Sequence, residues 1–458
     1  MKKMLSIILC ALIAGGALMS LAACGPNPDP LRTEPDAPDY ENDTQDTPDI
    51  STSEITTTVT LSTELQEKVN NHISDFSVQM FKRSVEVDED GNTLVSPISV
   101  YTLLSLLANG ADFTTKTEII DTLSGYYQYD DGTIVCYANY DPLTTEELNA
   151  YFFNYMNNLN STENSKLSMA NSVWVNNDAA VEFNDDFLSI GKNNYHSEVL
   201  DRSFDEKMLK ELNGWVEKNT DGMIEKVLDE IPYESVMFLV NALAFDAEWE
   251  EQYDENQIID NMEFNNYDGS QTKTEFLSSV ENKYLSVDNA RGFVKNYEGG
   301  NYSFIALLPD EDINIDDYIE NWFLPDTFSK AISTAAKGSE VHVMMPKFDA
   351  QTDLDLKEVL KKIGISISFD EETADFSRLG KRASEEDNLV IGTAVHKTYI
   401  SVDEKGTKAA AVTLFGIGDN AAATAPETYY VTLDRPFVYA IYDNNSQMPI
   451  FIGTVKNL

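Results

Sequence analysis

The residue types that perform nucleophilic or metal-assisted chemistry are scarce in this chain. It has four histidines and three cysteines among 458 residues, and it contains neither a Gly-x-Ser-x-Gly nor a His-Glu-x-x-His motif. A serine or cysteine nucleophile needs a neighbouring base, and a zinc site usually needs paired cysteine or histidine ligands. We therefore expect no enzyme, and we assign no catalytic residue and no metal ligand.

Two glycine-containing segments begin like ligand-binding loops. Asp88-Glu89-Asp90-Gly91-Asn92 begins like a calcium loop but lacks the glutamate that such a loop carries at its twelfth position. Gly416-Ile417-Gly418-Asp419-Asn420-Ala421 fits the start of a dinucleotide fingerprint, which requires a long following helix, whereas Pro426 interrupts the chain here. We predict a solvated turn, an exposed loop and no cofactor.

The acidic charge of the chain limits its partners. The formal net charge is -46 at pH 7. Binding to phosphate backbones needs a basic surface that releases counterions, so this chain should repel nucleic acid. The expected partners are proteins or small molecules.

The N-terminus has the features of an export signal. Lys2 and Lys3 precede an apolar segment that extends to about Met19, and small residues then lead into Cys24. This end resembles the lipobox of bacterial lipoproteins, in which residues 1-23 are removed and Cys24 carries the lipid. An uncleaved membrane anchor, or an ordinary signal peptide with a chance cysteine, remains an alternative. The lipoprotein interpretation places the protein on the extracellular surface of a bacterial membrane, attached through the N-terminal lipid alone.

The amino-acid composition changes near residue 60, and this change divides the chain after Cys24 into a tether and a single folded domain. After Cys24, the segment to residue 60 is rich in Pro, Asp, Thr and Ser, and its many acidic side chains have almost nothing to bury. Such a segment should form an extended, self-repelling linker. The apolar pattern is regular from residue 61 to 458 and contains no second linker, which predicts one domain. Within it Cys136 is alone, so no internal disulfide can form.

Helices and strands occupy different parts of this domain. Apolar residues recur at helical spacing in the first third of the chain, beginning with Leu65, Val69 and Ile73. Short β-branched or apolar runs follow later and predict strands at 235–245, 302–308, 340–345, 397–402, 429–433 and 449–455. Helices followed by mostly non-alternating strands indicate an α+β fold.

The segment 404–413 reads Glu-Lys-Gly-Thr-Lys-Ala-Ala-Ala-Val-Thr, and it resembles the reactive-loop hinge of an inhibitory serpin. Other segments that resemble serpins occur in the family's order across some 370 residues of the domain. They include Ser96-Pro97-Ile98-Ser99, Ala170-Asn171-Ser172-Val173-Trp174, Val240-Asn241-Ala242-Leu243-Ala244-Phe245, Pro346-Lys347-Phe348, Asp434-Arg435-Pro436-Phe437 and Phe451-Ile452-Gly453. Each segment alone is a weak signal, but together they identify the chain as a member of the serpin family.

This resemblance implies a fold and a mechanism. The fold is α+β with three β-sheets, about eight or nine helices and an exposed reactive-centre loop at residues 404–430. In this family a protease attacks the loop, which then enters the central sheet as a new strand and carries the acyl-enzyme with it. By the same resemblance, polar residues beneath the sheet form a shutter, and a tryptophan lies where the sheet opens. The corresponding residues here are Ser96, Ser99, Asn241, His396 and Trp249.

Strand insertion sets requirements that the hinge meets. Alternate residues of an inserted strand face the core, so they must be small and uncharged. Here these residues are Thr407, Ala409, Ala411 and Thr413, while Ala410 and Lys408 alternate with them and face outward. Gly406 supplies conformational freedom where insertion begins, next to Glu404.

The position of the scissile bond follows from the family's hinge length. Counting from Glu404 places it near Asn420, and the candidate residues are Asn420, Ala421, Ala422 and Ala423. Counting back from Pro436 points instead to about Ala425, because the distal side of this loop is long. Residues 412–433 contain no Arg or Lys. We therefore predict a monomeric inhibitor of elastase-like or subtilisin-like serine proteases, and the alternative is a non-inhibitory serpin that acts as a surface binding or carrier protein.

Overall fold

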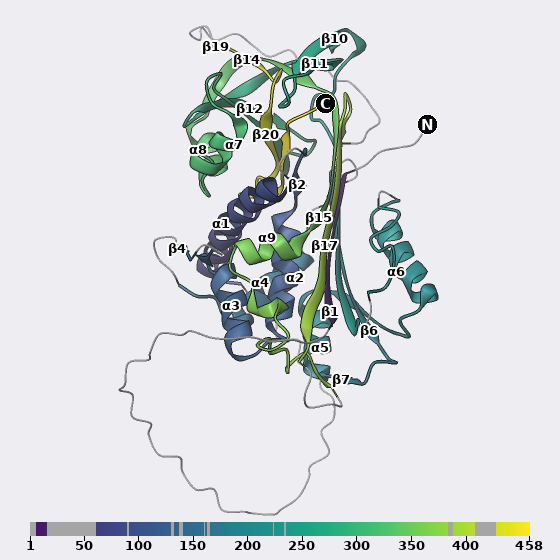
Figure 1. Cartoon of the computed structure of the whole chain (residues 1–458). Coiled ribbons are helices and arrows are strands. Elements are labelled where there is room, and N and C mark those ends of the chain that lie inside the picture. Colours follow the sequence, from purple (N-terminus) through teal and green to yellow (C-terminus); the bar gives the residue numbers. More distant parts are fainter. Residues whose placement is uncertain are drawn as a thin grey trace, which may run out of the picture.

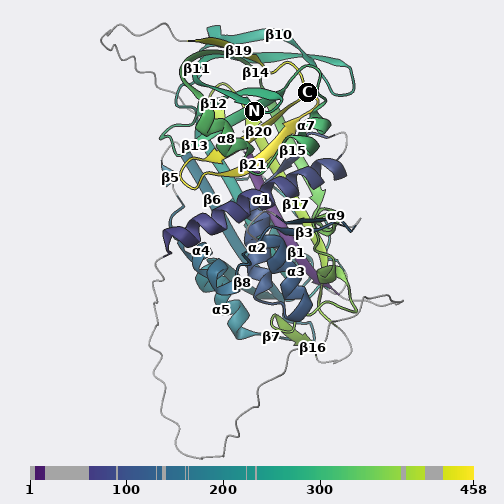
Figure 2. The same cartoon turned by 90° about the vertical axis from the view of Figure 1, so that its left-hand side faces the viewer.

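The computed structural model describes most of the predicted domain and a short N-terminal strand. The described residues are 6–15, 61–88, 91–129, 132–136, 141–159, 161–162, 165–222, 224–232, 235–382, 388–407 and 427–458. They form an α+β fold in which helices cover two large sheets (Figures 1 and 2). This confirms the predicted fold class.

Nine α-helices lie within the described ranges. They are α1 (Thr63–Val87), α2 (Pro97–Ala108), α3 (Phe113–Leu123), α4 (Thr145–Asn157), α5 (Asp185–Asn194), α6 (Glu206–Asn219), α7 (Ile315–Asn321), α8 (Thr327–Thr334) and α9 (Leu356–Lys362), with short 3-10 turns at Glu255–Gln257 and Ile367–Phe369. Polar side chains define their starts. Thr144 and Glu147, for example, form a reciprocal capping box that satisfies free N–H groups at the start of α4.

The first large sheet contains eight described strands. Its order is β15 (Phe348–Asp355), β17 (Val390–Val402), β1 (Ser6–Gly15), β9 (Met237–Glu248), β6 (Ser165–Asn176) and β5 (Ser161–Thr162). Two further strands join it, because β8 (Ser197–Arg202) pairs with β6 and β18 (Gly406–Thr407) pairs with β9. The chain therefore brings its N-terminal segment and its late strands into one sheet.

The second large sheet contains nine described strands, and β11 (Gln271–Val287) is the longest of them. Its order is β19 (Thr428–Thr432), β14 (Ala336–Pro346), β11 (Gln271–Val287), β12 (Ala290–Asn296), β13 (Tyr302–Pro309), β20 (Phe437–Asp443), β21 (Met448–Val455) and β2 (Leu94–Val95), and β10 (Ile258–Asn265) also pairs with β11. The strand β11 joins two parts of this network, because it pairs with β14 through residues 276–284 and with β12 through residues 284–287. Small pairs β3–β4 (Tyr126–Gln128, Ile134–Cys136) and β7–β16 (Val181–Phe183, Gly380–Arg382) complete the strands described.

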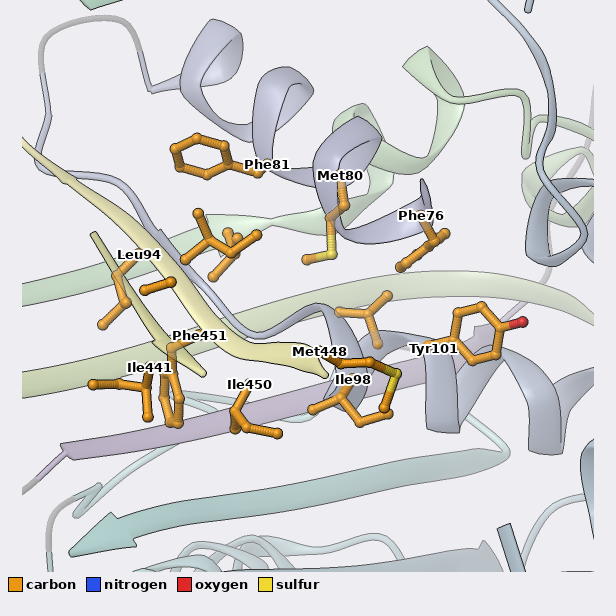
Figure 3. Close-up of a cluster of buried hydrophobic side chains, with 14 of the residues drawn as sticks. Phe76, Met80, Phe81, Leu94, Ile98, Tyr101, Ile441, Met448, Ile450 and Phe451 are labelled. Carbon is orange, nitrogen blue, oxygen red and sulfur yellow. The ribbon is translucent and has the colours of Figure 1, made fainter. Parts of the chain in front are cut away.

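The main core lies between the helices and the two sheets. Figure 3 shows Phe76, Met80 and Phe81 of α1 packed toward Ile450 and Phe451 of β21, with residues of α2 beside them. Every residue of α2 is buried, as expected for a helix that is apolar all round and enclosed by other elements.

A second apolar cluster covers the opposite face of the first sheet. Met208, Leu212 and Val216 of α6 pack against Trp174 of β6 and Phe238 of β9, and Figure 1 shows α6 on the side of this sheet away from α1 to α4. The strand β9 is thus covered on both faces, which explains why it is a nearly continuous apolar run. In the part of the chain described here, no helix has the length and apolar character of a membrane span.

Candidate functional site

The centre of the first sheet contains a position for one additional strand. The strands β9 and β17 lie on either side of β1, which pairs antiparallel with both of them. Ser6 to Ala14 of β1 lie opposite Phe245 to Met237 of β9, and Ile7 to Gly15 lie opposite Tyr399 to Val390 of β17. We call this inter-strand position the central slot. Only the backbone of its occupant is described.

The chain enters the top of this slot immediately after β17. Gly406 and Thr407 pair antiparallel with Glu248 and Ala247 of β9, so β18 and β1 run in the same direction beside β9. Each further residue along the loop would meet one residue earlier on β9. In that register Ala409 would meet Phe245, the position that β1 reaches with Ser6.

Gly406 is required by the backbone at the point of entry. Its φ is +144°, a region that side chains other than glycine rarely adopt. A Cβ atom built there would lie 2.3 Å from the carbonyl oxygen of Ala247. The close approach to β9 and the backbone angle therefore both select glycine.

Three hydrogen bonds hold the residues that precede Gly406. The indole Nε1 of Trp249 donates to the carbonyl oxygen of Asp403 at 2.9 Å, and the backbone N–H of Trp249 donates to that of Lys405 at 3.0 Å. The backbone N–H of Tyr253 donates to the carbonyl oxygen of Glu404 at 2.9 Å. We call Trp249 and Tyr253 the hinge clamp, because together they fix three consecutive carbonyl groups.

An ion pair ties the same segment to the neighbouring edge of the sheet. Lys347 Nζ lies 2.7 Å from Glu404 Oε2 and 2.7 Å from Glu275 Oε2. Partial burial opposes ionisation of Lys347 and of Glu404, but their hydrogen bonds and charges raise the pKa of Lys347 and lower the pKa of Glu404. Both groups are therefore charged at neutral pH.

The predicted shutter residues lie below the middle of the slot. Ser96 donates its backbone N–H to His396 Nε2 at 3.0 Å, and Asn241 Nδ2 donates to Asn171 Oδ1 at 2.7 Å. Complete burial lowers the pKa of His396 to about 3, so the ring is neutral and carries its proton on Nδ1. Ser99 is buried in the first turn of α2, and its hydroxyl has no hydrogen-bond partner among the described residues.

Two complementary groups of the shutter have no hydrogen-bond partner in the part of the chain that the structure describes. His396 Nδ1 and Asn241 Oδ1 are buried without a hydrogen bond among the described residues. Both residues pair in register with Cys10 of β1, so both side chains lie on one face of the sheet with β1 between them. A buried donor and acceptor without partners cost free energy, and β9 and β17 would bring these two groups nearer to each other if the slot closed.

Some predicted site residues lie outside the described residues. These are Cys24, Ala409, Ala410, Ala411 and Thr413, and the scissile-bond candidates Asn420, Ala421, Ala422 and Ala423. Other residues of the site were not predicted from the sequence: Tyr253, Lys347 as the partner of Glu404, Asn171, and the buried pair Lys295–Glu281. In the sequence, the pair is signalled by a lysine that directly follows the apolar residues Phe293 and Val294.

Comparison with known proteins identifies the class that this fold and site define. The family model "Serpin (serine protease inhibitor)" matches residues 71–458. The chain therefore belongs to the serpin family.

Individual relatives agree with this assignment. Alpha-1-antiproteinase 2 of Equus caballus is 28% identical over 400 residues, which cover 85% of this chain and 87% of the relative. The native-state crystal structure of the thermophilic serpin tengpin aligns with a TM-score of 0.74 and 38% identity, covering 86% of this chain and 95% of tengpin. Human thyroxine-binding globulin complexed with its ligand aligns with a TM-score of 0.70 and 25% identity. The alignment covers 86% of this chain and 99% of the globulin.

Proposed function

We propose that this serpin inhibits serine proteases by inserting its cleaved loop into the central slot. The observation that carries the proposal is the register of β18. Gly406 and Thr407 already pair with β9, and continuing their register leads into the position that β1 occupies. A cleaved loop that follows this path would become a central strand hydrogen-bonded on both sides.

The alternating side chains of the hinge support this path. The residues that would face the core are Thr407, Ala409, Ala411 and Thr413, and none of them is large or charged. About ten newly paired residues, at roughly 1 kcal/mol net per hydrogen bond plus apolar burial, would release on the order of 10 kcal/mol or more. The uninserted protein would then persist because of the barrier to opening its sheet.

Export processing would make the slot available. The strand β1 consists of residues 6–15, which lie inside the segment that a signal peptidase would remove before Cys24. The mature chain would then lack the occupant of the slot, and its own loop would be the segment that can replace it. Cys24 would anchor the mature protein by its lipid to the outer surface of a bacterial membrane, with residues 25–60 as the tether.

The loop composition favours particular targets. Alanine at positions 421 to 423 suits proteases with small apolar specificity pockets, such as elastase-like or subtilisin-like enzymes, and the absence of Arg and Lys from residues 412–433 disfavours trypsin-like enzymes. Cleavage after Asn420 by an asparagine-specific cysteine protease is the runner-up. Sequencing the N-terminus of the released fragment would distinguish these sites. The protein itself would act as a monomer that is consumed in the reaction and does not turn over as an enzyme.

Incubation of the mature protein with pancreatic elastase or subtilisin, followed by a denaturing gel, tests the proposal. A covalent complex that survives SDS would support trapping, whereas complete loop cleavage without a complex would contradict it. The unprocessed chain is a matched control. Because its slot contains β1, we expect it to be cleaved without trapping the protease.

A carrier role is the second candidate, and one cavity favours it. A cavity of about 620 Å³ lies between α1, the start of α8 and the turn that joins β20 to β21, and its lining includes Asp75, Asp326, Phe328 and Tyr442. One relative of similar fold is a globulin complexed with thyroxine, so ligand carriage occurs on this fold. The gel experiment separates the two candidates, because a carrier need not form a covalent complex with any protease.

A further inference from the structure

A buried ion pair lies directly behind the hinge clamp. Lys295 of β12 and Glu281 of β11 contact each other at 3.0 Å between Nζ and Oε1, and their side chains are only 3% and 14% exposed. These strands lie in the second sheet, which Figure 1 draws at the upper end of the first sheet. The pair is separate from the Lys347–Glu404 pair, which lies nearer the surface.

Both aromatic rings of the hinge clamp contact this lysine. Lys295 Nζ lies 4.5 Å from the centroid of the Tyr253 ring and 5.5 Å from that of the Trp249 ring. Cations are attracted to the faces of aromatic rings, and more strongly where water is excluded. Trp249 also stacks on Tyr297, with ring centroids 4.5 Å apart. The charge therefore contacts the side chains of the two clamp residues. The indole of Trp249 itself binds the Asp403 carbonyl group, and the backbone N–H groups of the same two residues bind those of Glu404 and Lys405.

The remaining polar groups around Lys295 continue the network. Ser279 Oγ donates to Glu281 Oε1 at 2.7 Å and lies 3.4 Å from the Tyr253 hydroxyl. Burial opposes the charge of Lys295, but the nearby Tyr253 and Glu281 raise its pKa, so the ammonium form is maintained. Each charge thus has a partner.

Stability alone is a poor explanation for a buried ion pair. Its desolvation cost often equals or exceeds the attraction, and apolar residues of similar size usually replace such pairs without loss of stability. Positioning is the better-supported role, because this pair contacts the two residues that bind the chain just before Gly406.

We infer that Lys295 and Glu281 are positioning residues that keep residues 403–405 fixed during loop insertion and confine the backbone rotation to Gly406. The inference rests on the proposed inhibitory function. A clamp that holds its position would direct the cleaved loop into the slot quickly, before the acyl-enzyme hydrolyses. A loosened clamp would slow insertion, and more inhibitor molecules would be cleaved without trapping a protease.

The test uses the double variant Lys295→Met/Glu281→Leu, which removes both charges while retaining side-chain bulk. We expect its thermal midpoint to stay near that of the wild type, while the number of inhibitor molecules consumed per trapped protease rises by about threefold or more. The control Lys330→Met/Asp288→Asn removes a surface pair with a 2.7 Å contact, and it should leave this number unchanged. An unchanged number in the Lys295→Met/Glu281→Leu variant would overturn the inference.

Hydrogen exchange provides a measurement that does not depend on inhibition. The amides of Trp249 and Tyr253 donate to the hinge carbonyls, so the peptide that contains them should exchange roughly tenfold faster in the double variant, with β6 unaffected. If exchange is unchanged, the inference fails even though the wild type inhibits. If exchange accelerates but the wild type traps no protease, the positioning role stands and the proposed function fails.

Discussion

Lys347 Nζ lies 2.7 Å from Glu404 Oε2, and this contact joins the residue just before β15 to the residue two positions before Gly406. The same lysine also contacts Glu275 at 2.7 Å. One cation thus serves two carboxylates, of which only Glu404 belongs to the hinge. The two partners can be removed separately, which makes the role of the hinge contact measurable.

Reversing the charge of Glu404 should lower both the thermal stability and the efficiency of inhibition. In Glu404→Lys, two ammonium groups would face each other, and we expect a lower thermal midpoint, corresponding to about 1 kcal/mol, together with more loop cleavage per trapped protease. Glu275→Gln is the control, because it removes the other partner of Lys347 outside the hinge. If both variants increase loop cleavage equally, the effect belongs to Lys347 and not to the hinge contact.

Replacing Gly406 by alanine should lower the thermal midpoint. The new Cβ would lie 2.3 Å from the Ala247 carbonyl oxygen at a φ of +144°, and we expect a cost of about 1–3 kcal/mol. Gly214→Ala provides the matched comparison. Gly214 lies within α6 with no atom within 4 Å of the added Cβ, so that variant should be neutral or slightly more stable. Differential scanning calorimetry measures both changes.

Adding a large charge at Thr407 should convert the inhibitor into a substrate. Thr407 pairs with Ala247 at the top of the slot, and the alternation of the hinge directs its side chain toward the core after insertion. Thr407→Arg should therefore be cleaved by elastase without forming an SDS-stable complex. Lys408→Arg should retain complex formation, because the same alternation directs residue 408 outward. Complexes formed by Thr407→Arg at the parent rate would contradict the predicted insertion path.

The sequence predicts much of this fold because serpin segments are distributed along the whole domain. The predicted strands at 302–308 and 449–455, for example, correspond to β13 and β21. Residues 4–19 were interpreted as an export segment, and the structure forms a strand from residues 6–15 within it. An apolar run fits a signal peptide or a buried strand equally well, so hydrophobic pattern alone cannot separate the two.

The site was less predictable than the fold because its contacts join distant parts of the chain. Glu404 and Trp249 come from recognisable segments, but the pairing of Lys295 with Glu281 depends on the register between β11 and β12. Ion-pair partners of this kind have no local sequence pattern. The scissile bond lies outside the described residues, and its position within 420–425 stays a prediction.

Acid should destabilise the protein through His396. Its pKa is about 3 in the fold because the ring is completely buried, whereas an unfolded histidine titrates near 6.5. The unfolded chain therefore binds an additional proton between these values, and stability falls as the pH decreases below about 6.5, by up to about 1.4 kcal/mol per pH unit. In His396→Gln the thermal midpoint should depend less on pH between 4.5 and 6.5. His196→Asn, which replaces an exposed histidine, serves as the matched control.

Asp75 should impose the opposite pH dependence. Burial and the nearby Asp326 raise its pKa to about 7, and both carboxylates line the cavity between α1 and α8. The folded protein therefore retains a proton that the unfolded chain releases near pH 4, and the stabilisation present at low pH is lost as the pH rises through 7. Asp75→Asn should raise the thermal midpoint at pH 8 and change it little below pH 4. Asp326→Asn should produce a smaller increase, because it removes the neighbouring charge but not the burial of Asp75. Equal midpoints for wild type and Asp75→Asn at pH 8 would show that Asp75 is solvated and ionised without cost.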